Sequence, residues 1–256
     1  MNENIYRRFA HYYEHELYSQ FSSAMLEHYD RLSKTYGLPT SGKLLDVACG
    51  NGAFGIGMAQ HGWQVTGVDQ SADQLSIARE HTGSLTINWQ QGDMRELAFT
   101  DEFDLVTCWF DSLNYMLTPE DLQSAFRGMY TALKPGGSCV FDMNTIYGIM
   151  VHWQENKDYL QVSTPELIEI HHNDCEWEKN IAHLHITIFD RGEKRADGSY
   201  EWERIDEIHS ERAYPVNEIQ AWLKEIGFTV VDTLGSLRDF APLKPDSRRV
   251  WFVCRK

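Results

Sequence analysis

The residues with the clearest capacity for chemistry are a glycine-rich loop and an acid spaced behind it. Residues 50–55, Gly-Asn-Gly-Ala-Phe-Gly, match the pattern G-x-G-x-x-G and follow a short apolar run at residues 43–48. Glycines in this pattern let the backbone approach a bound nucleotide closely. Asp69 ends the next apolar run, 19 residues after Gly50, where a carboxylate accepts hydrogen bonds from ribose hydroxyls. Loop and acid together predict a site for a nucleotide-containing cofactor, with a tight turn that binds nothing as the alternative.

Further features separate the two cofactor classes that use such a loop, dinucleotides and S-adenosylmethionine (SAM). Asp46 stands four residues before Gly50, where a carboxylate repels a pyrophosphate and attracts a sulfonium or ammonium group. Asp93 and Met94 follow the third apolar run, where they suit the amino group and the ring face of an adenine. The segment Lys-Pro-Gly-Gly precedes the fifth run at residues 134–137. The last two strands are expected to pair antiparallel, because the loop between them is too short for a helix. These features favour SAM.

With these residues the chain resembles the class I SAM-dependent methyltransferases, and within them a small-molecule branch with glycine N-methyltransferase and amino-sugar N-methyltransferases. The resemblance covers about residues 40–142 and 215–256. It implies an α/β, Rossmann-like fold whose seven-stranded sheet is mostly parallel, with strand seven antiparallel between strands five and six. It also implies that SAM is the cofactor. The residues expected to bind SAM are Asp46, Gly50, Gly52, Asp69, Gln70, Asp93, Met94, Trp109 and Phe110.

An N-terminal helix is predicted over residues 5–36, because apolar residues recur there at helical spacing. In the resembled family this helix closes over the cofactor, and one of its tyrosines contacts the methionyl end. Tyr13 and Tyr6 are therefore further candidates for binding the cofactor, with packing in the core as the alternative.

Polar residues after strands four and five are candidates for binding the methyl acceptor, since ligands of open α/β sheets bind beyond the carboxyl ends of the strands. Asp111 and Asn114 follow strand four, and Asp142 and Asn144 follow strand five. A helix cap or a tie between loops is the alternative for each pair.

Two residues near the end of a later strand complete the catalytic candidates, which are Asp111, Asn114, His209 and Arg212. His209 suits a general base, because an imidazole titrates near neutral pH. The Arg212 guanidinium suits a bidentate interaction with a substrate carboxylate, with a surface ion pair as the alternative. Acids before them, among them Glu203 and Glu207, are interpreted as a solvent-exposed strand edge.

The alternation of strand and helix predicts a parallel sheet, but it stops after Asn144 and resumes at Pro215. Three strand-like runs lie between, at residues 166–172, 181–189 and 200–210. This insertion carries 15 acidic and 7 basic residues, so it holds about half of the excess negative charge. The expected parts are a helical lid (1–40), a SAM-binding domain (41–145 and 215–256) and an antiparallel insertion that caps the acceptor site (146–214).

Composition and charge exclude several classes of protein. A net charge of −15 argues against nucleic-acid binding, because phosphate contacts need a basic surface. No apolar run approaches the roughly 18 residues of a membrane span, and the first residues lack the apolar core of a signal peptide. Five cysteines without a CxxC pair predict a reduced, cytoplasmic protein without a zinc site. No metal is expected, because His183 and His185 share a strand face without a third ligand.

The predicted function is SAM-dependent methyl transfer (EC 2.1.1.-) to a small molecule at nitrogen. The preference for nitrogen follows from the resembled enzymes and from the negative insertion, which attracts a cation. A protein or RNA methyltransferase and, less favoured, an NAD-dependent oxidoreductase are the alternatives. The sequence leaves the acceptor and the oligomeric state open, with a homodimer as one alternative.

Overall fold

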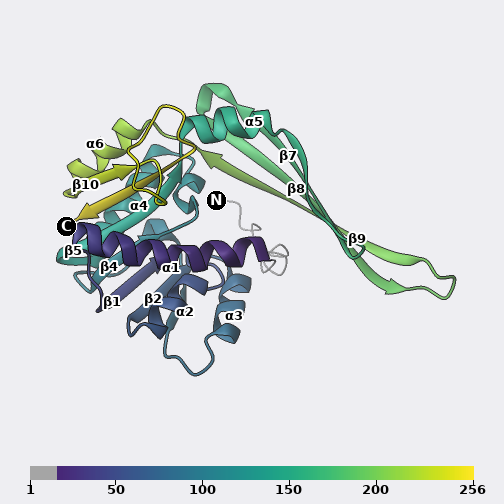
Figure 1. Cartoon of the computed structure of the whole chain (residues 1–256), viewed down its shortest axis with the longest axis horizontal. Coiled ribbons are helices and arrows are strands. Elements are labelled where there is room, and N and C mark those ends of the chain that lie inside the picture. The colour runs from purple at the N-terminus through teal and green to yellow at the C-terminus, as the bar shows by residue number, and fades with distance from the viewer. Residues whose placement is uncertain (1–15) are drawn as a thin grey trace.

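The computed structural model describes residues 16–256, with side chains from residue 24 onward. Two β-sheets are present (Figure 1): a seven-stranded sheet flanked by helices, and a four-stranded sheet that extends away from it. No helix in the described part of the chain is long and apolar enough to cross a membrane.

The seven-stranded sheet has the order β10-β11-β5-β4-β1-β2-β3. Its central pairs are parallel, whereas β11 pairs antiparallel with both β5 and β10. This order confirms the predicted sheet with strand seven between strands five and six. The strands are β1 (Lys43–Val47), β2 (Gln64–Asp69), β3 (Asn88–Gln91), β4 (Phe103–Cys108), β5 (Leu133–Asn144), β10 (Thr229–Leu234) and β11 (Arg249–Arg255).

Helices cover both faces of this sheet. Leu44 and Leu45 of β1 point to opposite faces, as alternation in a strand requires. Leu44 packs in a buried cluster with Phe54 of α2, and Leu45 packs in another with Phe126 of α4. The helices are α1 (Glu16–Tyr36), α2 (Ala53–Gln60), α3 (Ala72–His81), α4 (Pro119–Ala132) and α6 (Val216–Ile226).

Local signals set the ends of these helices. The Ser71 hydroxyl accepts a hydrogen bond from the Gln74 N–H (3.2 Å) and caps α3, as serine does at many helix starts. Thr118 caps α4, and Pro119 takes the first helical position, where its missing N–H costs nothing. α6 ends at Gly227, whose φ of 123° favours glycine. These ends fix where the loops at the edge of the sheet begin.

The segment at residues 134–137 is expected to precede strand five, but in the structure it is part of β5. The partner of Phe103 in β4 is Leu133, whereas the partner of Leu105 is Ser138, so the intervening residues form a bulge. Gly136 has a φ of 79°, and its N–H donates to the carbonyl of Lys256 (3.1 Å). The bulge thus ties the end of the chain to the edge of the sheet.

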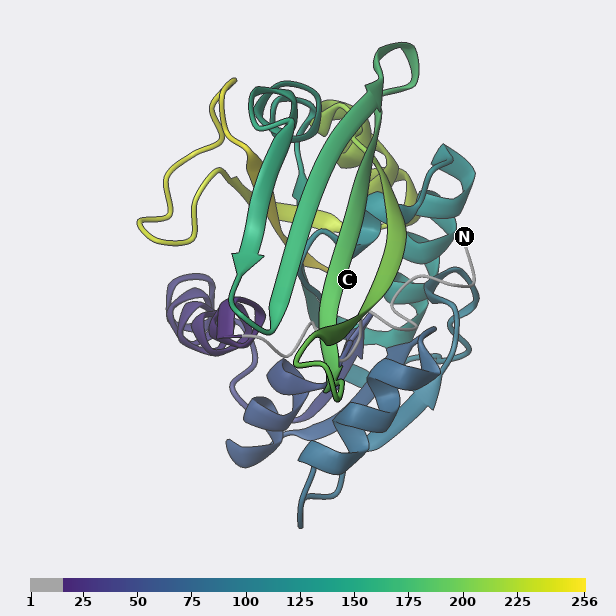
Figure 2. The same ribbon diagram turned by 90° about the vertical axis from the view of Figure 1, so that its right-hand side faces the viewer.

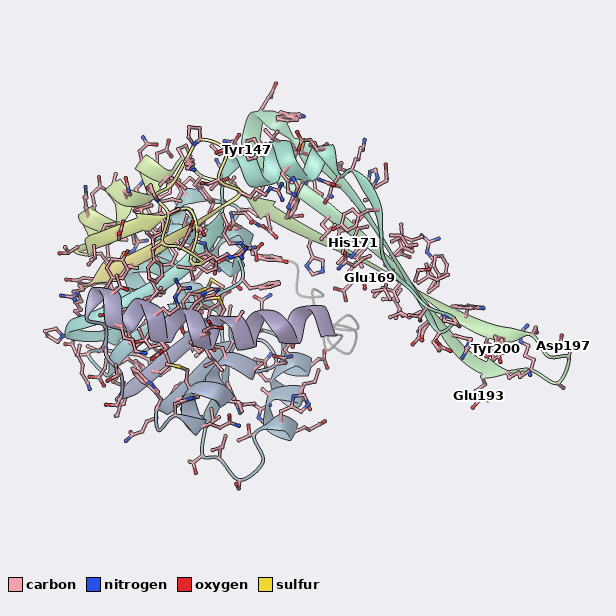
Figure 3. All side chains as sticks on the ribbon, viewed as in Figure 1. Tyr147, Glu169, His171, Glu193, Asp197 and Tyr200 are labelled. Atoms are coloured by element: carbon pink, nitrogen blue, oxygen red, sulfur yellow. The ribbon has the colours of Figure 1, made fainter. Side chains whose placement is uncertain are left out.

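The insertion forms the four-stranded antiparallel sheet with the order β6-β7-β8-β9. Its three predicted strands are present but longer, and the edge strand β6 is additional. Beyond β7, the hairpin of β8 and β9 continues as an arm (Figures 1 and 2), and Figure 3 places Asp197 at its tip. The strands are β6 (Asp158–Ser163), β7 (Leu167–Glu176), β8 (Ile181–Lys194) and β9 (Tyr200–Arg212).

The insertion leaves and rejoins the main sheet at the carboxyl ends of its parallel strands. β5 ends at Asn144, and β9 ends at Arg212, shortly before α6 begins. Short helical turns lie along the same edge and within the insertion. They are η2 (Met94–Glu96), η3 (Ser112–Tyr115), the π-helical η4 (Tyr147–His152), α5 (Trp153–Glu155) and η5 (Trp177–Lys179).

Candidate functional site

The glycine loop after β1 has the backbone geometry that its glycines require. Gly50 and Gly52 have φ values of 54° and 76°, in the left-handed region. A β-carbon on Gly52 would lie 2.6 Å from the Trp89 ring, so a larger residue does not fit there. A β-carbon on Gly50 would meet only the Gln74 side-chain oxygen, at 3.9 Å. The loop therefore presents its backbone to a space where a ligand can approach it closely.

Asp69 lies against this loop, as its spacing predicts. Its Oδ2 accepts the N–H of Gly50 (2.8 Å), and its Oδ1 accepts the N–H of Ser71 (2.8 Å). Burial raises the pKa of this carboxyl, while these backbone N–H groups oppose the rise. Each carboxylate oxygen retains capacity for a second hydrogen bond, so the pair of oxygens suits two hydroxyls. Gln70 follows in the same turn, and its carbonyl accepts from the Gln91 side chain (3.0 Å).

Gln74 is a candidate that the sequence analysis missed. Its side chain is buried, and its Oε1 has no hydrogen-bond partner among the described residues. In the capping box that starts at Ser71, a glutamine at this position usually bonds back to the N–H of the cap. Here Asp69 already accepts that N–H. The Gln74 oxygen therefore lies unused beside the glycine loop, where a bound donor would satisfy it.

Asp46 is a second buried carboxyl at this edge, at the end of β1. The Thr107 hydroxyl donates to its Oδ1 (2.9 Å). Burial raises the pKa of Asp46 to about 7; the Thr107 hydrogen bond opposes this rise, and the charge of Asp69 adds to it. A cation beside this carboxyl would stabilise its ionised form.

Asp93 and Met94 follow β3, but Asp93 is already paired. Its carboxylate accepts the backbone N–H of Arg95 (2.8 Å) and the guanidinium of the same residue (2.5 Å). Burial alone would raise the pKa of Asp93, but the hydrogen bonds from Arg95 outweigh it and lower the pKa. Arg95 also pairs with Asp121 of α4 (3.2 Å). Met94 is partly buried against the main core.

The turn after β4 is conformationally strained. Phe110 and Asp111 have φ values of 61° and 53°, which residues other than glycine rarely adopt. The carboxylate of Asp142, at the end of β5, accepts both of their N–H groups, at 2.8 and 3.0 Å. Trp109 is buried with its ring edge-on to Phe54, and its indole N–H has no partner among the described residues. Backbone conformations as rare as those of Phe110 and Asp111 are typical of binding sites.

Three acids at this edge surround one arginine. Arg249, the first residue of β11, bonds through its two terminal nitrogens to Asp142 and to Asp111 (3.2 Å for Asp111). The Asn144 amide donates to Asp111 and to Glu211 (2.9 Å). Burial raises the pKa of Asp142 to about 6 although Arg249 opposes it. Burial first, and then the charge of Asp111, raises the pKa of Glu211.

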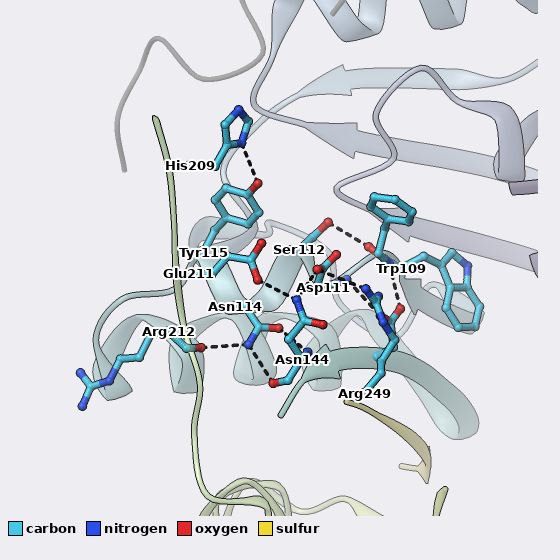
Figure 4. A network of polar contacts seen from close by, with 12 residues as sticks. Trp109, Asp111, Ser112, Asn114, Tyr115, Asn144, His209, Glu211, Arg212 and Arg249 are labelled. Atoms are coloured by element: carbon cyan, nitrogen blue, oxygen red, sulfur yellow. Dashed lines mark hydrogen bonds and ion pairs between the residues drawn. The ribbon is translucent and has the colours of Figure 1, made fainter. Parts of the chain in front are cut away.

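The structure brings Asn114 to this cluster but leaves the guanidinium of Arg212 outside it (Figure 4). Asn114 is fully buried, and its amide donates to the carbonyls of Asn144 (3.1 Å) and Arg212 (2.9 Å). Its oxygen accepts the N–H of Asn144 (2.8 Å). The Arg212 guanidinium instead donates to the carbonyl of Leu117 (2.9 Å) and lies over the Tyr214 ring. Asn114 thus holds β5 and β9 together at the site.

His209 faces the same turn from β9. Its Nδ1 lies 2.8 Å from the Tyr115 hydroxyl, and its Nε2 lies 3.2 Å from the Glu207 carboxylate. The prediction of a solvent-exposed Glu207 is wrong, since its side chain is only 9% exposed. Glu207, His209 and Glu211 alternate along β9 and therefore share its inner face. This alternation in the sequence indicates that Glu207 shares a strand face with His209, whereas no sequence pattern indicates Tyr115.

Two further predictions concern the N-terminal tyrosines and metal. Tyr13 and Tyr6 lie outside the described residues. Within residues 16–256, no group of three or more His, Cys, Asp or Glu side chains is arranged to hold a metal ion. His183 and His185 each pair with a neighbouring acid, Glu176 (3.3 Å) and Asp174 (3.0 Å) respectively.

Comparisons with known proteins agree with this geometry. Residues 44–137 match the model of a methyltransferase domain. A Geobacillus sp. protein that carries a methyltransferase name is 33% identical, over 98% of this chain and 99% of its own length. An N,N-dimethyltransferase of Streptomyces venezuelae, named for a dTDP-3-amino-trideoxy-glucopyranose, is 27% identical over 60% of this chain and 64% of its own. A SAM-dependent methyltransferase structure from Clostridium acetobutylicum superimposes with a TM-score of 0.80 at 25% identity, covering 97% of both chains.

Proposed function

Since this chain belongs to the family of SAM-dependent methyltransferases, we propose that it methylates a small-molecule amine at nitrogen. The observation that carries the proposal is the charge at the carboxyl edge of the sheet. Asp111, Asp142 and Glu211 converge there around a single guanidinium, that of Arg249, within the described part of the chain. Because burial raises the pKa of Asp142 and Glu211, a cationic group at this edge would stabilise their ionised forms, whereas a phosphate or a carboxylate would not.

The residues of the glycine loop fit SAM. Gly50 and Gly52 would let the backbone approach the cofactor, and Asp69 would accept from the ribose hydroxyls. The unused oxygen of Gln74 and the buried Asp46 suit the cationic methionyl end. Asp93, Met94, Trp109 and Phe110 would surround the adenine and the remaining part of the cofactor. SAM, when bound, supplies an electrophilic methyl group.

The amine would lie between this edge and the insertion. We place residues 146–214 as the cap of the acceptor site, because β9 contributes His209 and Glu211 to the same cluster as η3 and β5. Residues 1–40 would form the lid on the cofactor side. The named substrate of the Streptomyces relative is an amino sugar, which supports an amine acceptor here.

The alternatives receive less support. A nucleic-acid acceptor conflicts with a net charge of −15, and a protein acceptor lacks any specific observation in its favour. Family membership removes the reading as an NAD-dependent oxidoreductase.

A product assay tests the proposed function. Release of S-adenosylhomocysteine is measured over amines, amino acids, phenols and sugars, with SAM labelled in its methyl group and the product analysed by mass spectrometry. The expected result is a labelled amine. Turnover of phenols or hydroxyls alone would contradict methylation at nitrogen. Thermal shifts with SAM, S-adenosylhomocysteine, NAD and NADP provide the control for cofactor choice, because only ligands that bind the folded state stabilise it.

Asp69→Ala is expected to weaken binding of SAM and of S-adenosylhomocysteine alike, by about 1.5–3 kcal/mol, the range of hydrogen bonds to charged groups. The physical reason is that the ribose is common to both ligands and remote from the methyl group. Calorimetric titration measures both affinities. Asp73→Ala, which removes another acid in the first turn of α3, is the matched control and should change neither. Equal affinities for wild type and Asp69→Ala would refute the assignment.

A further inference from the structure

Three side chains in hydrogen-bonding contact link the turn after β4 to the insertion. Tyr115 of η3 contacts His209 Nδ1 (2.8 Å), and His209 Nε2 contacts Glu207 (3.2 Å). The His209 and Glu207 side chains are only 3% and 9% exposed, and the rings of Tyr115 and His209 meet edge-on. Neither Tyr115 nor Glu207 was a candidate in the sequence.

The carboxylate of Glu207 sets the direction of these hydrogen bonds. An ionised Glu207 can only accept, so its contact with Nε2 favours the tautomer of His209 that carries its proton on Nε2. In a neutral imidazole the other nitrogen is then an acceptor, and the Tyr115 hydroxyl donates to Nδ1. The order Tyr–His–Glu matches the hydroxyl–imidazole–carboxylate arrangement that activates serine nucleophiles, with a phenol in place of the serine hydroxyl.

We propose that Tyr115 is a catalytic residue that takes the proton of the acceptor amine, and that His209 and Glu207 are positioning residues for it. This assignment rests on the proposed function. Tyr115 lies at the carboxyl edge of the sheet, directly after Asn114, whose amide is bonded to the backbones of β5 and β9. Its partner His209 comes from β9, next to Glu211 of the acidic cluster (Figure 4). The phenol is therefore held where the acceptor is expected.

The proton and electron balance is simple. The ammonium form of the acceptor gives a proton to the Tyr115 oxygen as the phenolic proton passes to His209 Nδ1, and Glu207 stabilises the resulting imidazolium. The amine lone pair forms the new N–C bond while the S–C bond of SAM breaks and its electron pair stays on sulfur. The positive charge thus moves from sulfur to the methylated nitrogen, and His209 later releases its proton to water.

The four-stranded sheet contains a second Tyr–His–Glu contact series in the same order, which serves as a matched control. His171 Nδ1 contacts the Tyr159 hydroxyl (2.7 Å), and its Nε2 contacts Glu169 (2.5 Å). His171 is as buried as His209, at 3% exposure. It lies on β7, and its tyrosine comes from the edge strand β6 rather than from the turn after β4. Figure 3 shows Glu169 and His171 midway along the insertion.

The experiment measures S-adenosylhomocysteine release at saturating SAM with ethanolamine, glycine and D-glucosamine as probe amines. Tyr115→Phe should lower kcat on the fastest of these amines by about 10²–10⁴-fold, the usual contribution of a general base, with KM and SAM affinity nearly unchanged. His209→Ala should lose a similar factor and recover part of it when imidazole is added. His171→Ala should keep kcat within about threefold of wild type. Equal losses in His171→Ala and His209→Ala would overturn the proposal, because burial alone would then explain both.

Nitrogen-15 NMR of labelled histidine provides a readout that needs no acceptor. The His209 signals, identified by their loss in His209→Ala, should show a proton on Nε2, and the Nδ1 signal should shift in Tyr115→Phe. A proton on Nδ1 together with intact amine methylation would overturn the relay and leave the proposed function standing. A proton on Nε2 with none of the three amines methylated would overturn the proposed function, and with it the catalytic role of Tyr115, while the hydrogen-bond order would stand.

Discussion

Replacing Arg249 with methionine is expected to lower the free energy of unfolding by about 3–5 kcal/mol at pH 8, as for other buried ion pairs that lose one partner. Methionine keeps the length of the arginine stem, so packing beside Phe110 and Trp251 is largely retained. The loss arises because Asp142, fully buried, and Asp111 are left without their cation. Urea denaturation followed by circular dichroism measures the change.

The effect of pH separates this cause from a packing defect. Burial already raises the pKa of Asp142 to about 6 against the opposing charge of Arg249, and without that charge the pKa rises further. The folded variant then holds protons that the unfolded chain has released, so its stability falls as pH rises. The deficit should therefore be much smaller at pH 5 than at pH 8. A deficit independent of pH would refute the electrostatic explanation.

Arg204→Met supplies the matched control. Arg204 also pairs with a carboxylate, that of Asp206 (2.9 Å), but both side chains are more than half exposed. Exposed ion pairs contribute little, so this variant should unfold at nearly the same urea concentration as wild type. A comparable loss in both variants would mean that burial of the Arg249 cluster is not what matters.

The parts of the site that the sequence predicts are those that depend on local pattern. The spacing of Gly50 and Asp69 places both at the ends of neighbouring strands, and they meet at 2.8 Å. The alternation of strand and helix predicts the order of the main sheet, which the structure confirms. Edge strand β6 escaped prediction because its residues are largely exposed and a bulge interrupts its alternation.

The remaining parts depend on contacts between distant segments. Arg249 reaches Asp142 only because β11 runs antiparallel to β5, which pairs Arg249 with Asn144. Asn114 bonds to backbone groups 30 and 98 positions away, and no local pattern encodes such partners. Gln74 has the local signature of a capping box, but Asp69 takes the N–H that a capping glutamine would accept. Such residues become candidates only when the fold shows what surrounds them.

Asp46→Asn is expected to stabilise the ligand-free protein by an amount that grows with pH. Burial raises the pKa of Asp46 from 3.8 to about 7, so the folded state binds a proton that the unfolded state releases. Linkage then makes the carboxyl cost stability as pH rises between these values: about 2 kcal/mol at pH 5 and about 4 kcal/mol at pH 8. An asparagine avoids this cost, and its oxygen can still accept from Thr107. Urea denaturation across this pH range measures the gain.

Asp104→Asn is a control of opposite sign. Burial alone would raise the pKa of Asp104, but hydrogen bonds from the Lys134 ammonium (2.8 Å) and the Lys43 N–H (2.8 Å) outweigh it and lower the pKa. The ionised form of Asp104 therefore stabilises the fold above its unfolded pKa, and Asp104→Asn should lose stability at pH 8 rather than gain it.

SAM affinity shows whether the stability that is lost by burying the Asp46 carboxyl serves cofactor binding. If the carboxylate compensates the cationic end of SAM, Asp46→Asn should bind SAM about tenfold more weakly at pH 8, a change of about 1.4 kcal/mol. Its affinity for the uncharged thioether S-adenosylhomocysteine should fall less, because the sulfonium charge is then absent. Gain of stability with unchanged affinity for both ligands would mean that Asp46 is a destabilising buried acid without a role in binding. Gain of stability together with a selective loss of SAM affinity would show that the Asp46 carboxylate destabilises the ligand-free fold but binds the cationic end of SAM.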